Sequence, residues 1–171
     1  MEVLTDKQII IGDASSREQV LEVFSNKAKE LGFTESDLVP IFLEREKEFS
    51  TAFGNGVAIP HAKSSKVLKT GVFVYKSVNA INWDGEEVKL AIAIITPEDS
   101  SNVHLQILSQ LSRKLMHSDF RESLLNAETE MEVLKIRGNK YDKKNGSFMC
   151  MSYGISTYFY GSRSHRNGSK K

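Results

Sequence analysis

The chain reads Gly54-Asn-Gly-Val-Ala-Ile-Pro-His-Ala-Lys63 about one third of the way along, and this stretch decides how the rest is interpreted. Its glycines permit a tight turn, while Pro60 fixes its own φ angle and favours an extended conformation for Ile59. The chain is therefore stiff up to His61. Because an imidazole keeps a neutral fraction near pH 7, His61 is a candidate nucleophile. The alternative is a loop histidine without a chemical role, since a histidine near glycine and proline is common.

The composition is typical of a soluble globular domain. The 171 residues suffice for one domain with a core, and 40% are apolar and 26% charged. The formal net charge of +1 gives no reason to expect nucleic acid or an anionic membrane as a partner. No apolar run reaches the roughly 18 residues that span a bilayer. The N-terminus lacks a signal-peptide pattern and the single cysteine excludes an intrachain disulfide, so we expect a cytoplasmic protein.

Strand-like and helix-like segments alternate along the chain. Apolar and β-branched runs predict strands at residues 3–11, 70–75 and 88–95, and Asn82–Gly85 carries the Asp-Gly pair of a hairpin turn. Helical spacing and capping signals predict helices at residues 15–32, from 34 to about 48, 103–116, 118–125 and 128–136. Such alternation indicates the α/β class with a mixed sheet. Trp83, next to the turn, is predicted to be a packing anchor.

Two details of the helices are specific enough to test. Ser15 is predicted to be the N-cap of the first helix, in a capping box with Glu18. The helix at 103–116 has a predicted buried stripe, which consists of Leu105, Leu108, Leu111, Ser112 and Leu115.

Two further polar residues accompany His61. His104 lies at the N-terminal turn of the helix that follows a buried strand, where ligands bind in α/β sheets, and Arg45 lies on the polar end of the second helix. A histidine at a helix start more often only caps or packs. A reactive imidazole with a second imidazole and an arginine nevertheless suits an anionic, phosphoryl-bearing group. The four histidines and one cysteine match no metal-ligand spacing, so we expect no metal and no cofactor.

Four blocks of the sequence carry a family resemblance. They are Glu44–Lys47, Gly54–His61, Val67–Val72 and Val103–Leu108. In these blocks and their order, over residues 3–137, the chain resembles the mannitol/fructose-type enzyme IIA domains of the bacterial phosphoenolpyruvate:sugar phosphotransferase system. The resemblance implies an α/β fold with a mixed sheet of about five strands flanked by helices.

The resemblance also implies roles for the candidate residues. His61 would be the phosphoryl-accepting nucleophile through Nε2, His104 the second active-site histidine, and Arg45 a source of positive charge for the phosphoryl group. The implied activity is that of a phosphotransferase in sugar uptake, with a phosphohistidine intermediate. The alternatives are a regulatory IIA-like module whose His61 phosphorylation controls partner proteins, and a ligand-binding domain in which His61 is never phosphorylated.

The implied partners are two other proteins of the same system. The phosphocarrier HPr would donate the phosphoryl group, and a cysteine of an enzyme IIB domain would accept it in trans. HPr must reach His61, so we expect an exposed apolar face around it. The residues predicted for this face are Phe53, Gly54, Gly56, Val57 and Ile59.

The composition changes after Gly138, which predicts an IIA domain at 1–138, a polar linker at 139–147 and a disordered tail at 148–171. Cys150 lacks the Pro-Thr-Gly that follows the phosphocysteine in IIB domains, so we interpret it as an incidental thiol. Back-translation of residues 149–170, with codons chosen among those allowed and read from the second base, can give CACPTGLAHTFMAAEAIEMAAK. This peptide looks like the IIB phosphocysteine loop and its helix. We therefore hypothesise a frameshift near residues 143–145 that leaves a IIB fragment out of frame.

Overall fold

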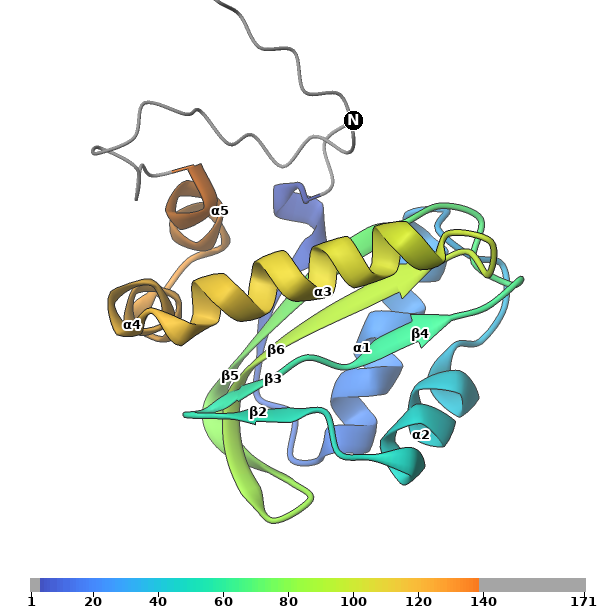
Figure 1. The fold of residues 1–171 in the computed structure, drawn as a ribbon. Helices are drawn as coiled ribbons and strands as arrows, with labels where there is room; N and C mark the ends of the chain where they lie inside the picture. The colour runs from blue at the N-terminus through green and yellow to red at the C-terminus, as the bar shows by residue number, and fades with distance from the viewer. Residues whose placement is uncertain (1–3, 139–171) are drawn as a thin grey trace, which may run out of the picture.

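The centre of the fold is the hairpin of β5 (Gly71–Trp83) and β6 (Glu86–Thr96) in the computed structural model, which describes residues 4–138 (Figure 1). Its two-residue turn places Asp84 at φ 56° and Gly85 at φ 92°. Positive φ at both positions matches the right-handed twist of the two strands. The Asn82 side chain accepts a hydrogen bond from the backbone N–H of Gly85 at 2.8 Å. The predicted hairpin is therefore present, with longer strands than the apolar runs indicated.

The sheet extends from this hairpin in both directions. In the described part of the chain it contains six strands. Five follow the order β1-β5-β6-β3-β2, and the sixth, β4, pairs with β6 further along that strand than β3 does. The four short strands are β1 (Ile9–Gly12), β2 (Ala52–Gly54), β3 (Val57–Ala58) and β4 (His61–Lys63). β1 pairs in parallel with β5, and β3 and β4 each pair in parallel with β6. The pairs β2–β3 and β5–β6 are antiparallel. The sheet is mixed, as predicted, with six strands rather than about five.

Among residues 4–138, five α-helices cover the two faces of the sheet. They are α1 (Arg17–Glu30), α2 (Val39–Glu48), α3 (Ser101–Met116), α4 (Ser118–Asn126) and α5 (Glu130–Gly138). A short 3-10 turn, η1 (Asp6–Gln8), precedes β1, so the N-terminal strand begins later than predicted. Figure 1 shows α3, α4 and α5 on one face and α1 on the other, with α2 beside β4. Within residues 4–138, no helix has the length and apolar character needed to cross a membrane.

Alternating side chains of the central strands build one core on each face. Phe73 and Tyr75 pack with α1 and α2, while Val72 and Val74 pack with α3, α4 and α5. Residues 90–95 of β6 divide in the same way, because successive side chains of a strand point to opposite faces. This two-sided burial explains why residues 88–95 form a nearly continuous apolar run.

The N-cap of α1 lies one residue later than predicted, and the predicted capping box with Glu18 is not formed. The N-cap is Ser16, whose hydroxyl accepts from the N–H of Gln19 at 3.3 Å. The Gln19 side chain in turn accepts from the N–H of Ser15 at 2.8 Å. Two serines precede the helix, so either could be the N-cap. The helix begins after Ser16, which puts Gln19 and not Glu18 at its third position.

The second helix begins at Val39 and not at Thr34. Thr34 forms a bridge with Val67, and its hydroxyl donates to the Lys66 carbonyl at 2.8 Å, so it belongs to an extended segment. Asp37 accepts from the N–H of Val39 at 3.0 Å, and a proline is tolerated in the first helical turn that follows. The long-range contact of Thr34 overrides the local helix signal.

The buried stripe of α3 also differs from the prediction. Leu105 is 62% exposed, whereas Ile107, Leu111 and Leu115 are buried. Leu108 and Ser112 are half-buried. The inward face of the helix is rotated so that His104, and not Leu105, turns toward the sheet.

Ser77 on β5 supplies a stability prediction. Its side chain is 2% exposed, and its hydroxyl is the one buried side-chain polar atom without a hydrogen-bond partner in residues 4–138. An unsatisfied buried group costs about 1–3 kcal/mol, so Ser77→Ala should raise the free energy of unfolding by about 1 kcal/mol. Urea denaturation of the folded domain measures the change.

Ser25 is the matched control. It is equally buried, but its hydroxyl donates to Asp37 at 2.8 Å and accepts from the N–H of Leu38 at 2.9 Å. Ser25→Ala should therefore lower the free energy of unfolding. A comparable loss in both variants would contradict the assignment of Ser77 as unsatisfied.

Candidate active site

The parallel pairing of β4 with β6 brings the two predicted histidines together. His61 is in register with Ile94, and Lys63 with Thr96, the last residue of β6. The chain then turns into α3, which carries His104 in its first turn. The centroids of the two imidazole rings are 5.1 Å apart, with 53° between the ring planes. The pair lies where the parallel strands end, a common position for ligand sites in α/β sheets.

Both ring nitrogens of His61 form hydrogen bonds. Nδ1 lies 3.0 Å from the carbonyl oxygen of Ile59, and because a carbonyl can only accept, Nδ1 carries the proton. Nε2 therefore holds the lone pair, and it accepts from Nε of Arg45 at 2.8 Å. His61 thus presents an unprotonated Nε2, which is the form that a nucleophilic imidazole requires.

Arg45 reaches this nitrogen from the last turn of α2. Its Nη1 donates to the carbonyl of Phe49 at 2.9 Å, immediately after the helix ends. The guanidinium is therefore held at two points, one on its own segment and one on His61. This hydrogen bond and the contact between the two imidazole rings bring the predicted residues Arg45, His61 and His104 together.

A buried carboxylate anchors the helix that carries Arg45. Glu46, the next residue, is 6% exposed and accepts from the backbone N–H of Thr51 at 3.0 Å and from the Thr51 hydroxyl. It also accepts from Nε1 of Trp83 at 3.3 Å. Trp83 is fully buried, which confirms it as a packing anchor. These bonds tie the end of α2 to the sheet and so position Arg45.

His104 is held by a residue that the sequence analysis missed. His104 is 8% exposed, and its Nδ1 lies 3.3 Å from the hydroxyl of Thr96, which is fully buried. The one signal for Thr96 in the sequence is a hydroxyl residue at the end of an apolar strand, directly before a proline. The role of Thr96 becomes visible only in the folded protein, where α3 places His104 next to the end of β6.

Burial keeps both histidines neutral. It lowers the pKa of His61 below its usual range, and the Arg45 charge acts in the same direction, against the hydrogen bond to Ile59. Burial also lowers the pKa of His104 to about 4, and repulsion from His61 in its protonated form and from the charges of Lys63 and Arg45 acts in the same direction. At neutral pH each ring therefore carries one proton, and His61 is available as a nucleophile.

The predicted docking face around His61 needs correction. Val57 and Ile59 are buried in the core on the α3 side of the sheet, so they are not exposed to a partner. Phe53 is half-buried and packs against the same core. These apolar side chains face α3, α4 and α5, which cover this side of the sheet, and so they belong to the interior.

The glycines lie away from the histidine pair. Gly54 and Gly56 flank the turn between β2 and β3, with φ of 85° and 80°. Val57 is in register with Leu90, and His61 with Ile94, four residues further along β6. At about 3.3 Å per residue, this places the turn about 13 Å or more from His61. Gly54 and Gly56 therefore form a hairpin turn and do not line the site.

Other exposed side chains neighbour the site residues along the chain. Phe49 is 77% exposed beside Arg45, and Leu105 is 62% exposed next to His104. Lys63 is exposed and lies two residues after His61, on the same side of β4. The exposed residues next to the site residues are therefore apolar or basic, and they lie outside the predicted set.

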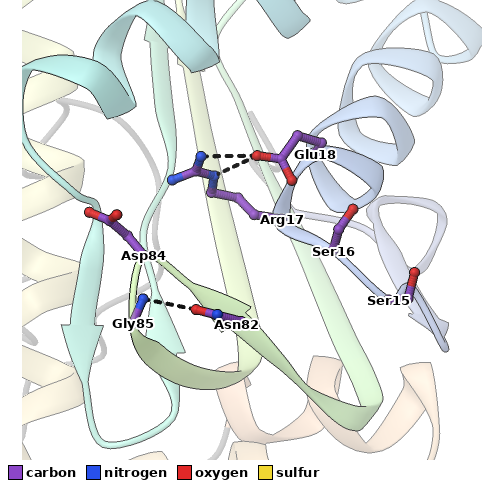
Figure 2. A pocket seen from close by; sticks show the side chains of 7 residues that line it. All are labelled: Ser15, Ser16, Arg17, Glu18, Asn82, Asp84 and Gly85. Carbon is purple, nitrogen blue, oxygen red and sulfur yellow. Dashed lines mark hydrogen bonds and ion pairs between the residues drawn. The ribbon is translucent and has the colours of Figure 1, made fainter.

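A separate hollow lies at the other end of the hairpin, between the start of α1 and the β5–β6 turn (Figure 2). Its lining residues are Ser15, Ser16, Arg17, Glu18, Asn82, Asp84 and Gly85. Figure 2 shows Arg17 bonded to Glu18, with 2.9 Å between Nη2 and Oε1. Glu86 begins β6 eight residues before Ile94, so this hollow is about 26 Å along the strand from His61.

The charges around His61 lead to a titration prediction. We expect His61 to titrate below 6.5 and His104 near 4 in the native protein, as followed by NMR of the ring nitrogens. Arg45→Gln removes a nearby positive charge, so it should raise the pKa of His61. Arg113→Gln is the control, because Arg113 lies exposed on α3 and bonds to Ser109. A pKa of His61 at or above 6.5 in the unaltered protein would show that burial does not govern the ring.

The chain is similar to known proteins in both sequence and fold. The model of the family "Phosphoenolpyruvate-dependent sugar phosphotransferase system, EIIA 2" matches residues 2–139. The fructose-specific EIIA component of Haloferax volcanii is 46% identical over 94 residues, which are 53% of this chain and 61% of that protein. The chain therefore spans less than two thirds of the length of this relative.

Two solved structures are similar over most of the described residues. The nitrogen regulatory protein IIA-Ntr of Neisseria meningitidis is 27% identical with a TM-score of 0.71, over 78% of this chain and 95% of that one. The mannitol IIA of Escherichia coli is 26% identical with a TM-score of 0.69, over 78% of this chain and 97% of that one. With the family match over residues 2–139, these findings show that the chain belongs to the EIIA 2 family of the phosphoenolpyruvate-dependent sugar phosphotransferase system.

Proposed function

We propose that this domain accepts a phosphoryl group on Nε2 of His61 and passes it to a second protein. The arrangement of His61 carries the proposal, because Nδ1 is bound to the Ile59 carbonyl and Nε2 is left unprotonated, 2.8 Å from a guanidinium nitrogen. The lowered pKa of His61 supports the same reading, since a neutral imidazole is needed for attack. Membership of the EIIA 2 family supports the reaction class.

The proposed donor is HPr phosphorylated on a histidine. The lone pair of His61 Nε2 attacks the phosphorus in line, and a new P–N bond forms as the P–N bond of the donor breaks. The electron pair of the broken bond returns to the donor ring. Nδ1 of His61 keeps its proton, and the Ile59 carbonyl stabilises the positive charge that develops on the ring. One P–N bond replaces another, so His61 can pass the group onward to the thiolate of a IIB cysteine.

Arg45 would change partners during the reaction. In the resting structure its Nε–H occupies the lone pair that must attack, while Nη1 remains bound to the Phe49 carbonyl. A guanidinium has five N–H donors in a planar fork, which suits the oxygens of a phosphoryl group. A small rotation of Arg45 would free Nε2 and direct donors to those oxygens. His104, with its ring 5.1 Å from that of His61, would contribute a further donor.

The same surface would receive HPr and, afterwards, the IIB domain. Phe49 and Leu105 are exposed apolar side chains beside Arg45 and His104. Large exposed apolar side chains around a reactive group are typical of a transient docking surface. We therefore assign the docking role to Phe49 and Leu105 in place of Val57 and Ile59, which are buried.

A second candidate function is regulatory. The likeness to the nitrogen regulatory protein IIA-Ntr of Neisseria meningitidis favours it, at 27% identity and a TM-score of 0.71. In that case His61 would still be phosphorylated, and its phosphorylation state would control the binding of a partner. The two functions differ in whether the phosphoryl group leaves for a cysteine.

We also propose the division of the chain into an IIA domain at 1–138, a linker at 139–147 and a frameshifted IIB fragment at 148–171. The family match over residues 2–139 supports the first boundary. The linker, the tail and Cys150 lie outside the described residues. If the division is right, His61 is the phosphoryl carrier of this chain, and the acceptor cysteine belongs to another protein.

Phosphorylation can be tested directly with purified components. With phosphoenolpyruvate, enzyme I and HPr, the protein should gain one acid-labile phosphoryl group, and His61→Ala should gain none. Arg45→Gln should still be labelled on a histidine, but about a hundredfold more slowly, as for the loss of one stabilising charge. His117→Ala is the control, because His117 is exposed at the junction of α3 and α4. An unlabelled wild-type protein would overturn the proposal.

A chase separates the carrier from the regulatory module. The phosphorylated domain is mixed with a IIB domain of the fructose type, and the label is followed by mass spectrometry. Rapid transfer to the IIB cysteine supports the carrier function. Retention of the label on His61 in the presence of an active IIB domain supports regulation instead.

The gene sequence tests the frameshift. Read from the second base of each codon, the segment for residues 149–170 should encode CACPTGLAHTFMAAEAIEMAAK or a close variant. We expect this peptide because allowed codons for residues 149–170 can encode it in that frame. Stop codons or an unrelated peptide in that frame would refute the hypothesis.

A further inference from the structure

We propose that Thr96 is a positioning residue, whose hydroxyl donates to Nδ1 of His104 and so keeps this imidazole in the tautomer with the proton on Nε2. That tautomer offers an N–H donor to the phosphoryl group on the neighbouring His61. The inference rests on the proposed phosphorylation of His61, and it assigns a role to a residue that does not itself touch the phosphoryl group.

The direction of the Thr96–His104 hydrogen bond follows from the number of partners. The hydroxyl of Thr96 is in a fully buried residue, and Nδ1 of His104, at 3.3 Å, is its one hydrogen-bond partner in the part of the chain that the structure describes. If Nδ1 carried the proton, the hydroxyl would accept it, and the proton of the hydroxyl would be buried without an acceptor. Such unsatisfied groups are rare and costly. If the hydroxyl donates, both groups are satisfied and His104 carries its proton on Nε2.

The choice of tautomer matters because His104 has one proton at neutral pH. Burial lowers its pKa to about 4, so the doubly protonated ring is not available as a donor under these conditions. A neutral ring has one nitrogen that donates and one that accepts. With the lone pair on Nε2, the ring would repel the phosphoryl oxygens. With the proton there, it would hydrogen-bond to them.

Thr96 and the Ile59 carbonyl therefore set opposite tautomers on the two rings. The carbonyl, 3.0 Å from Nδ1 of His61, requires a proton on that atom and leaves Nε2 free to attack. The hydroxyl of Thr96 does the reverse for His104. The centroids of the rings are 5.1 Å apart, so a nucleophile and a donor lie side by side. Neither ring needs to exchange a proton with water before transfer.

NMR of the ring nitrogens in the unphosphorylated protein tests the tautomer. In the wild-type protein, Nε2 of His104 should have the chemical shift of a protonated nitrogen and Nδ1 that of an unprotonated one. Thr96→Val keeps the shape of the side chain but removes the hydroxyl, so the two shifts should move toward each other as the tautomers mix. Thr96→Ser keeps a hydroxyl and should restore the wild-type pattern.

Phosphoryl transfer from phosphorylated HPr tests the consequence. Thr96→Val should lower kcat about tenfold with KM for HPr unchanged, because the donor acts on the transferring group and not on docking. Thr96→Ser should recover most of the rate. Thr34→Val is the matched control, since Thr34 is also buried and its hydroxyl donates to the Lys66 carbonyl at 2.8 Å, away from His104. It should leave the His104 shifts and kcat unaltered.

Two results would overturn the inference. One is a Thr96→Val protein whose His104 shifts are those of the wild type, and the other is a Thr96→Val protein with mixed tautomers but an unchanged kcat. The NMR comparison does not require phosphorylation. A wild-type protein that is never labelled would therefore refute the proposed function, while the NMR comparison still decides the contact between Thr96 and His104.

Discussion

The parallel pairing of β4 with β6 is the constraint on which the candidate site depends. It sets His61 level with Ile94, and it ends at Thr96, from which the chain turns into α3. Because α3 must cover the same face of the sheet, its first turn returns over the end of β4 and brings His104 beside His61. A slip of one residue in this register would turn His61 to the opposite face of the sheet, away from His104.

The polar contacts around the two rings complete this arrangement. The Ile59 carbonyl and Arg45 define the state of His61, and the buried carboxylate of Glu46 fixes the helix from which Arg45 comes. Arg45 and Glu46 are neighbours on α2, and Ile59 lies in the segment between β3 and β4. The site is therefore assembled by the packing of α2 and α3 at one end of the sheet. Its surface is formed by exposed side chains such as Phe49 and Leu105, which do not contribute to the core.

Local patterns predicted much of the fold because their signals depend on neighbouring residues. The Asp-Gly turn and the alternation of strands and helices were confirmed. The errors arose where distant contacts compete with local ones. Thr34 joins Val67 in place of starting a helix, and Val57 is buried because α3, α4 and α5 cover its side of the sheet. An apolar residue in a motif has the same appearance in sequence whether it faces a partner or the core.

By itself, the sequence determined the α/β class, the hairpin and the three residues Arg45, His61 and His104 as candidates, since turn chemistry, periodicity and motif are all local. Tertiary structure alone decided that these residues meet, because they come from α2, β4 and α3 and are joined only by packing on the sheet. It alone placed the hydroxyl of Thr96 against His104 and the carbonyl of Ile59 against His61. Which nitrogen of each ring carries a proton depends on those contacts, and no local pattern encodes a contact between separate elements.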